Sequence, residues 1–229
     1  MVENEQFDVL NHVLRRFYAA GILDEFMLIG SWCLYFYRFH FNSPQGLPAF
    51  RTLDVDFLIP NAKRVKNKAD VSQLLKEEGF VPTFSRANGL VKYDHPELQV
   101  EFLVPEIGKG QDGPVAIKAL SISAQSLRYL DLLIDYPRLI SFEGMQILVP
   151  EPAAFALHKL IVSSRRMKQE KQKSDLETGV GLLEFLYSRP DEIKRIKSVL
   201  LELPKKWSKT ILSVSVKYFP RLNQTAQEL

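Results

Sequence analysis

The apolar positions in the first two thirds of the chain switch repeatedly between the period of a helix and the period of a strand. Residues 4–20 carry apolar side chains in steps of three and four, which predicts a helix that ends at Gly21. Further helices are predicted over 31–41 and over 71–78, the latter with Asp70 as its N-cap. Short apolar runs bounded by turn residues predict strands over 26–29, 53–59, 80–84, 90–93, 98–105, 115–122, 129–140 and 145–149.

The strand signals fade after the sequence Pro-Glu-Pro at 150–152. Apolar residues at helical spacing then predict helices over 153–162, 175–186, 191–203 and 207–218. The polar tail after Pro220 is expected to fray. The pattern therefore predicts an α/β domain over 1–150 and an all-helical domain over 151–229.

The composition is that of an ordinary globular protein. The chain has 229 residues, of which 46% are hydrophobic and 25% are charged, and no apolar run approaches the roughly 20 residues of a membrane span. The acidic start of the chain is unlike a secretory signal peptide. Cys33 is the only cysteine, which excludes an internal disulfide and a cysteine-cluster metal site. We therefore expect a cytoplasmic protein.

The net charge of +3 is unevenly distributed. Residues 151–229 carry 15 Lys and Arg against 9 Asp and Glu, whereas residues 1–150 carry 15 against 18. An acidic half and a basic half are typical of a protein that handles polyanions. A solvated helical surface explains the basic half equally well.

The strand that ends at Pro60 carries the most specific chemistry. Side chains alternate along a strand, so Asp54 and Asp56 share one face while Val55 and Phe57 point to the other, into a core. Two neighbouring carboxylates repel each other unless a cation lies between them. Mg²⁺ is typically held by one or two carboxylates together with substrate phosphates. The pattern therefore predicts a metal-binding edge.

A second element suits the phosphates. Gly30 and Ser31 interrupt an apolar run just before a predicted helix, where the backbone amides can approach a ligand and the Ser31 hydroxyl can cap the helix or bind a phosphate oxygen. The string Gly-Ser-Trp-x-Leu at 30–34, followed by Arg-Thr-x-Asp-x-Asp-Phe-Leu at 51–58, resembles the nucleotidyltransferase superfamily, which has the polymerase-β-like fold. Within it, the string is similar to the minimal bacterial branch that includes the abortive-infection toxins.

This resemblance implies a nucleotidyltransferase-like domain with a mixed sheet, and it implies further site residues. Relatives commonly carry a third carboxylate on the strand beside Asp-x-Asp, and Glu101 matches that place, although a surface acid is the alternative. In the toxin-like branch a helix Lys reaches the nucleotide phosphates and a later Asp places that Lys or the substrate. These positions match Lys159 and Asp175, whose alternative is to be exposed helix residues. Arg51 is assigned to the nucleotide, although it stands one residue closer to the first Asp than in many relatives.

The resemblance thus implies a nucleotidyltransferase that uses Mg²⁺, or Mn²⁺ in its place, held by Asp54, Asp56 and Glu101. The substrate would be an NTP bound in a cleft between the two domains, and the acceptor hydroxyl could belong to RNA, a protein or a small molecule. The toxin-like branch also implies a protein partner of antitoxin type. Two other functions stay open: an inactive nucleotide-binding or regulatory module of the same fold, and a nucleic-acid-binding protein that uses the basic run 165–173.

Overall fold

The computed structural model describes residues 2–49, 52–85, 89–108 and 113–228, and the chain divides into two compact units. The first, here termed the sheet unit, comprises Met1–His40, Arg51–Asp131 and Arg138–Val149. The second, termed the helical unit, comprises Phe41–Phe50, Leu132–Pro137 and Pro150–Leu229. Within the described ranges, none of the helices combines the length and the apolar composition that a membrane crossing requires.

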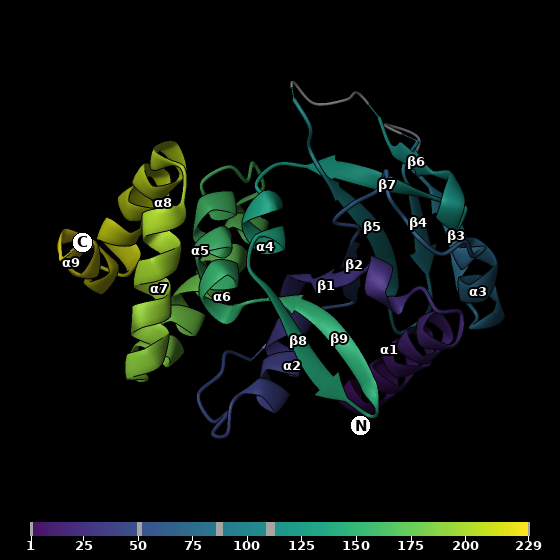
Figure 1. Cartoon of the computed structure of the whole chain (residues 1–229), viewed down its shortest axis with the longest axis horizontal. Helices are drawn as coiled ribbons and strands as arrows, with labels where there is room; N and C mark the ends of the chain where they lie inside the picture. Colours follow the sequence, from purple (N-terminus) through teal and green to yellow (C-terminus); the bar gives the residue numbers. More distant parts are fainter. Residues whose placement is uncertain (1, 50–51, 86–88, 109–112, 229) are drawn as a thin grey trace. The chain divides into compact units, whose positions relative to one another are not determined.

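In the described residues, seven strands form the mixed sheet of the sheet unit (Figure 1). They are β1 (Met27–Ile29), β2 (Asp54–Leu58), β3 (Val81–Phe84), β4 (Val91–Asp94), β5 (Gln99–Pro105), β6 (Val115–Ile117) and β7 (Ile122–Leu127). The order is β1-β2-β5-β4-β3, and β5 runs parallel to β2 and β7, whereas the other pairs are antiparallel. The sheet branches at β5, because the first half of β5 pairs with β4 and its second half with β7.

The helices of the sheet unit begin and end within two residues of the predicted bounds. They are α1 (Val2–Ala19), α2 (Cys33–His40) and α3 (Val71–Glu77). At the end of α1, Gly21 adopts a positive φ of 67°, and the amides of Gly21 and Ile22 bond back to carbonyls of the last turn, so the predicted C-cap is confirmed. Asp70 caps α3 through a hydrogen bond from the Gln73 amide, 2.9 Å long, as predicted.

The core of the sheet unit lies on one face of β2 and β5. The rings of Phe17, Phe26, Phe57 and Phe102 contact one another there, with centroids 4.9–6.0 Å apart. Phe57 and Phe102 are fully buried, and they alternate along their strands with acidic residues. Burial of this aromatic cluster therefore fixes which face of the sheet receives the acids.

A separate two-stranded hairpin lies mostly within the sheet unit. It consists of β8 (Pro137–Phe142) and β9 (Met145–Pro150), joined by a turn in which Glu143 and Gly144 both have positive φ. Phe142 packs against Phe7 and Phe36 at centroid distances of 5.6 and 5.5 Å. This aromatic contact connects the hairpin to α1 and α2.

The helical unit is built around one buried helix (Figure 1). Its helices are α5 (Pro152–Ser163), α6 (Gln169–Tyr187), α7 (Pro190–Glu202), α8 (Lys205–Tyr218) and α9 (Arg221–Gln227), preceded by the short α4 (Asp131–Ile134). α5 contacts α6, α7 and α8, and it is buried along most of its length. The loop after α2 also belongs to this unit, since Phe41 packs on Phe185 at a centroid distance of 4.9 Å.

Four predicted segments differ from the structure, and one of them is the helix predicted over 175–186, which begins at Gln169 as α6. The strand predicted over 115–122 is a tight hairpin of β6 and β7, because Ser121 adopts a left-handed conformation (φ 54°) that reverses the chain. The first part of the strand predicted over 129–140 forms α4 instead. The tail after Pro220 does not fray but forms α9, which buries Leu222 completely and accepts a 2.8 Å hydrogen bond from Tyr187 at Thr225. An apolar run of this length does not distinguish helix from strand, and two buried contacts are enough to order a polar tail.

Candidate functional site

Three carboxylates lie on one face of the sheet unit. Asp54 and Asp56 are half-buried on β2, whereas Val55 and Phe57, which alternate with them, are buried in the core. Glu101 is the register partner of Asp56 in the parallel pair of β2 and β5, so the two side chains leave the sheet on the same side. The Glu101 side chain is only 14% exposed, unlike a solvated surface acid. Asp54, Asp56 and Glu101 are together termed the carboxylate face.

Gly30 lies directly against this face. β1 pairs with β2 so that Ile29 opposes Asp56, and the next residue, Gly30, adopts a φ of 73°. A Cβ atom on Gly30 would overlap the carboxylate of Asp56, so the close approach requires a residue without a side chain. Ser31 is the second residue of the 3₁₀ turn Gly30–Trp32 that leads into α2, and the N-cap of this turn is Ile29. The two roles predicted for its hydroxyl, capping the helix and binding a phosphate oxygen, both stay predictions.

Lys92 is a residue of this site that the sequence analysis missed. It lies on β4, and its ammonium group donates hydrogen bonds to Glu101 and, over 2.9 Å, to Oε1 of Gln99. Burial alone would lower the pKa of Lys92, but the hydrogen bond and charge of Glu101, together with the charges of Asp54 and Asp56, raise it above its ordinary value. Lys92 is therefore a cation of the carboxylate face.

The alternation of β4 could have identified Lys92. Val91 and Tyr93 are apolar neighbours, so Lys92 belongs to the opposite face of a strand predicted to lie in the same sheet as Glu101. The missing information was the pairing of β4 with β5, in which Tyr93 opposes Val100. That register brings Lys92 beside Glu101, but apolar periodicity alone does not predict it.

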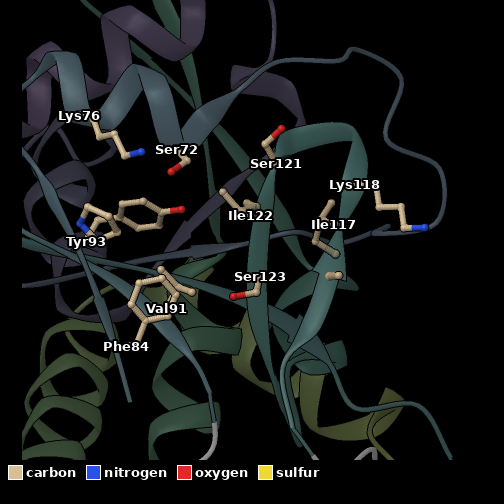
Figure 2. Close-up of a pocket in the computed structure, with 12 residues that line it drawn as sticks. Ser72, Lys76, Phe84, Val91, Tyr93, Ile117, Lys118, Ser121, Ile122 and Ser123 are labelled. Atoms are coloured by element: carbon tan, nitrogen blue, oxygen red, sulfur yellow. The ribbon is translucent and has the colours of Figure 1, made fainter. Parts of the chain in front are cut away.

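A hollow of about 430 Å³ opens on the other side of β4 (Figure 2). It lies where the sheet branches, and its walls come from α3, β3, β4 and the hairpin of β6 and β7. Tyr93 lines it and also contacts Phe102 edge to face at 5.9 Å, which fixes this hollow on the core side of the sheet. Since Lys92 and Glu101 point to the opposite side, the hollow is not part of the carboxylate face.

In the helical unit, the predicted residues Lys159 and Asp175 form an ion pair. Nζ of Lys159 lies 2.6 Å from Oδ1 of Asp175, and Nε of Arg166 lies 2.7 Å from Oδ2. The side chains of Lys159 and Asp175 are 12% and 7% exposed, so neither is an ordinary surface residue. Burial alone would raise the pKa of Asp175, but Lys159 and Arg166 hold it below its ordinary value.

His158 is buried beside this ion pair. Neither ring nitrogen has a hydrogen-bond partner within the described ranges. Burial, reinforced by the positive charge of Lys159, lowers the pKa of His158 from 6.5 to about 3. His158 is therefore neutral in the folded protein at neutral pH, and no pattern in the sequence indicates a role for it.

The comparison with protein families identifies the chain. A family described as "Nucleotidyltransferase" matches residues 9–195, which is most of the chain. The chain belongs to this nucleotidyltransferase family. The matched range contains the carboxylate face, Gly30, Ser31 and the pair of Lys159 and Asp175. The family match does not show whether the chain belongs to the toxin-like bacterial branch, so membership of that branch stays a prediction.

Comparisons with curated proteins and with solved structures say little more about this nucleotidyltransferase. No curated protein matches the chain. Among solved structures, the chain is similar to an antigenic nucleotidyltransferase-like protein from Paracoccidioides brasiliensis, with 15% identity, 94% of this chain and 92% of the other covered, and a TM-score of 0.46. A likeness at this level indicates nothing further about substrates or site residues.

Arg51, the remaining predicted nucleotide-binding residue of the nucleotidyltransferase, lies outside the described residues.

Proposed function

We propose that this nucleotidyltransferase transfers a nucleoside monophosphate from an NTP to an acceptor hydroxyl and releases pyrophosphate, with Mg²⁺ as its cofactor. The observation that supports this proposal is the carboxylate face, in which Glu101 stands in register with Asp56 beside Asp54. Three carboxylates on a polar face, within a chain of this family, are suited to metal-assisted phosphoryl chemistry.

The residues present fit a divalent cation. All three donors are carboxylates, which are hard oxygen ligands of the kind that Mg²⁺ and Mn²⁺ prefer. Gly30 has no side chain and lies against the Asp56 carboxylate, and Lys92 places one positive charge against Glu101. As they stand, no three His, Cys, Asp or Glu side chains of the described residues converge as a metal site. Glu101 would therefore have to turn from Lys92 toward the aspartates when it binds a metal.

The bound metal would neutralise charge on the triphosphate and make the acceptor hydroxyl more acidic. In the proposed reaction the acceptor oxygen forms a bond to the α-phosphorus, and the bond from that phosphorus to the pyrophosphate oxygen breaks. Glu101 either binds the metal or takes the proton of the acceptor hydroxyl. Ser31 and the backbone at Gly30 would donate hydrogen bonds to the phosphates. This division of roles needs no covalent enzyme intermediate.

Lys159 keeps its predicted role in binding the β- and γ-phosphates, with Asp175 holding its ammonium group. The ion pair of 2.6 Å between them supports the positioning part of this proposal. A charge-assisted hydrogen bond is worth about 1.5–3 kcal/mol, which is roughly a tenfold to hundredfold change in Kd. Lys159→Ala should therefore weaken the binding of an NTP by that factor and leave the binding of the nucleoside nearly unchanged.

The experiment that tests the proposed function supplies each α-³²P-labelled NTP with Mg²⁺ and, in turn, total RNA, cell protein and small-molecule extract. Wild-type protein should label one of these acceptors in a Mg²⁺-dependent way, and Asp54→Asn with Asp56→Asn should abolish the labelling. Asp24→Asn removes an exposed acid of the same unit and serves as the matched control. Binding of an NTP without transfer to any acceptor would instead favour an inactive nucleotide-binding or regulatory module.

A further inference from the structure

Lys92 occupies a cation position on the carboxylate face. The register of β4 and β5 places Tyr93 opposite Val100, which brings the preceding residue, Lys92, beside Glu101. Its ammonium group bonds to Glu101 and to Gln99, and Gln99 in turn donates a 2.5 Å hydrogen bond to Asp94. Lys92 is thus held by a hydrogen-bonded network on two strands.

We propose that Lys92 is the built-in counter-ion of the carboxylate face, and that it must release Glu101 before Glu101 can bind a metal ion. This inference rests on the metal dependence in the proposed function. Without metal, the carboxylates of Asp54, Asp56 and Glu101 would repel one another, and one nearby ammonium group reduces that repulsion. With a metal bound, the same ammonium group would repel the metal and compete for the oxygen of Glu101.

The competition between Lys92 and the metal should couple metal binding to NTP binding. The Lys92 side chain is 34% exposed, so its ammonium group has solvent into which it can move when it leaves Glu101. A triphosphate offers the released ammonium a new anionic partner, whereas a free metal ion does not. Lys92 should therefore make metal and NTP binding mutually dependent, and by linkage each should strengthen the other by the same factor.

The test is a titration with Mn²⁺ alone, followed by electron paramagnetic resonance, in wild-type protein and in Lys92→Met. Removing the ammonium group should tighten Mn²⁺ binding about fivefold or more, as expected for the loss of a competing ion pair of about 1 kcal/mol. The melting temperature of Lys92→Met should fall below that of wild type in metal-free buffer, and the two should converge at saturating Mn²⁺. If Lys92→Met does not fold, Lys92→Gln provides the same loss of charge with a polar side chain.

Four comparisons separate this role from a structural one. Lys92→Arg keeps the charge and should retain the wild-type affinity for Mn²⁺, and Lys118→Met removes an exposed charge of the same unit and should also leave it unchanged. In a Glu101→Gln background, Lys92→Met should no longer tighten Mn²⁺ binding, because no carboxylate remains at position 101 for Lys92 to release. An α,β-methylene NTP analogue should strengthen Mn²⁺ binding more in wild type than in Lys92→Met.

The outcomes distinguish the two proposals. If wild-type protein binds Mn²⁺ but Lys92→Met binds it with the same affinity, Lys92 does not compete with the metal and the inference is overturned. An equal loss of melting temperature with and without Mn²⁺ would also overturn it, because that result describes a purely structural ion pair. If wild-type protein binds no Mn²⁺ even with the NTP analogue, the metal-dependent function itself is contradicted.

Discussion

Gly30 and Asp56 lie so close together that a Cβ atom on Gly30 would overlap the Asp56 carboxylate. Gly30 also has a φ of 73°, a conformation that L side chains rarely adopt. Two independent constraints therefore require glycine at this position. The close contact follows from the place of Gly30 directly after β1, whose last residue, Ile29, is the register partner of Asp56.

We predict that Gly30→Ala destabilises the sheet unit by more than its backbone conformation alone explains. A positive φ costs a non-glycine residue about 1–2 kcal/mol, and displacement of the Asp56 carboxylate adds to that cost. Gly144→Ala is the matched control, because Gly144 has a φ of 81° and no heavy atom within 4 Å of its added Cβ. Chemical denaturation should give a larger loss for Gly30→Ala, and equal losses would show that the contact with Asp56 is unimportant.

The buried His158 predicts how stability depends on pH. Its pKa is about 3 in the folded protein and 6.5 ordinarily, so between these values the unfolded chain binds more protons. The free energy of unfolding should therefore fall as the pH drops below about 6.5, by up to about 1.4 kcal/mol for each pH unit. Asp175, whose pKa is also lowered, adds to the loss only below its ordinary value of 3.8.

Replacement of His158 isolates this contribution. His158→Leu removes the titrating group and two ring nitrogens without partners in the described part of the chain, so urea denaturation between pH 7 and 4.5 should depend less on pH than in wild type. His158→Gln removes the proton binding but keeps a polar group, and it should flatten the dependence without the apolar gain. A variant that loses stability as steeply as wild type would locate the acid sensitivity elsewhere.

The ion pair of Asp175 should contribute more than an exposed pair on the same helix. Asp175→Asn leaves the buried ammonium of Lys159 without its charged partner, and breaking a buried pair in this way costs about 3–5 kcal/mol. Glu177→Gln breaks the exposed pair of Lys173 and Glu177 and should change the free energy of unfolding by less than about 1 kcal/mol. Similar losses in the two variants, measured by denaturation, would contradict the importance of the buried pair.

Replacing Glu101 should lower the rate of nucleotide transfer but leave the affinity for the NTP nearly unchanged. Glu101→Gln keeps the size of the side chain, so the affinity for an NTP should stay within a few-fold of wild type. Loss of a positioned acid or base should lower the rate of transfer by about 10²–10⁴-fold. If Glu101→Gln transfers the nucleotide at the wild-type rate in single-turnover experiments, Glu101 has no catalytic role and serves only as a structural partner of Lys92.

Much of the fold could be predicted from local patterns. The caps at Gly21 and Asp70 depend on a few neighbouring residues, and the structure confirms both. Strand alternation likewise predicted that Asp54 and Asp56 share a face, because their neighbours are apolar. The hairpin of β6 and β7 was missed because an apolar run that folds back on itself has the same pattern as one long strand.

From the apolar pattern alone, the candidate site was predictable only where it depends on a single strand, whereas Glu101, Lys159 and Asp175 were assigned through the family resemblance. The contribution of Lys92 requires the pairing of β4 with β5, and the overlap at Gly30 requires the pairing of β1 with β2. Neither register follows from the apolar pattern, since several registers bury the same residues. The prediction of fraying after Pro220 was wrong for a related reason, because Thr225 bonds to Tyr187, which is distant in the chain, and Leu222 is fully buried.

The carboxylate face is proposed to hold the metal ion of a nucleotidyl transfer site. The most direct measurement is the anomalous scattering of Mn²⁺ in crystals of the wild-type protein grown with an α,β-methylene NTP analogue. We predict an anomalous peak bound by Asp54 and Asp56, with the α-phosphate of the analogue beside it and the Lys92 ammonium no longer on Glu101. A peak that lies elsewhere on the chain, with Glu101 still paired to Lys92 and no analogue near Asp54 and Asp56, would contradict the claim.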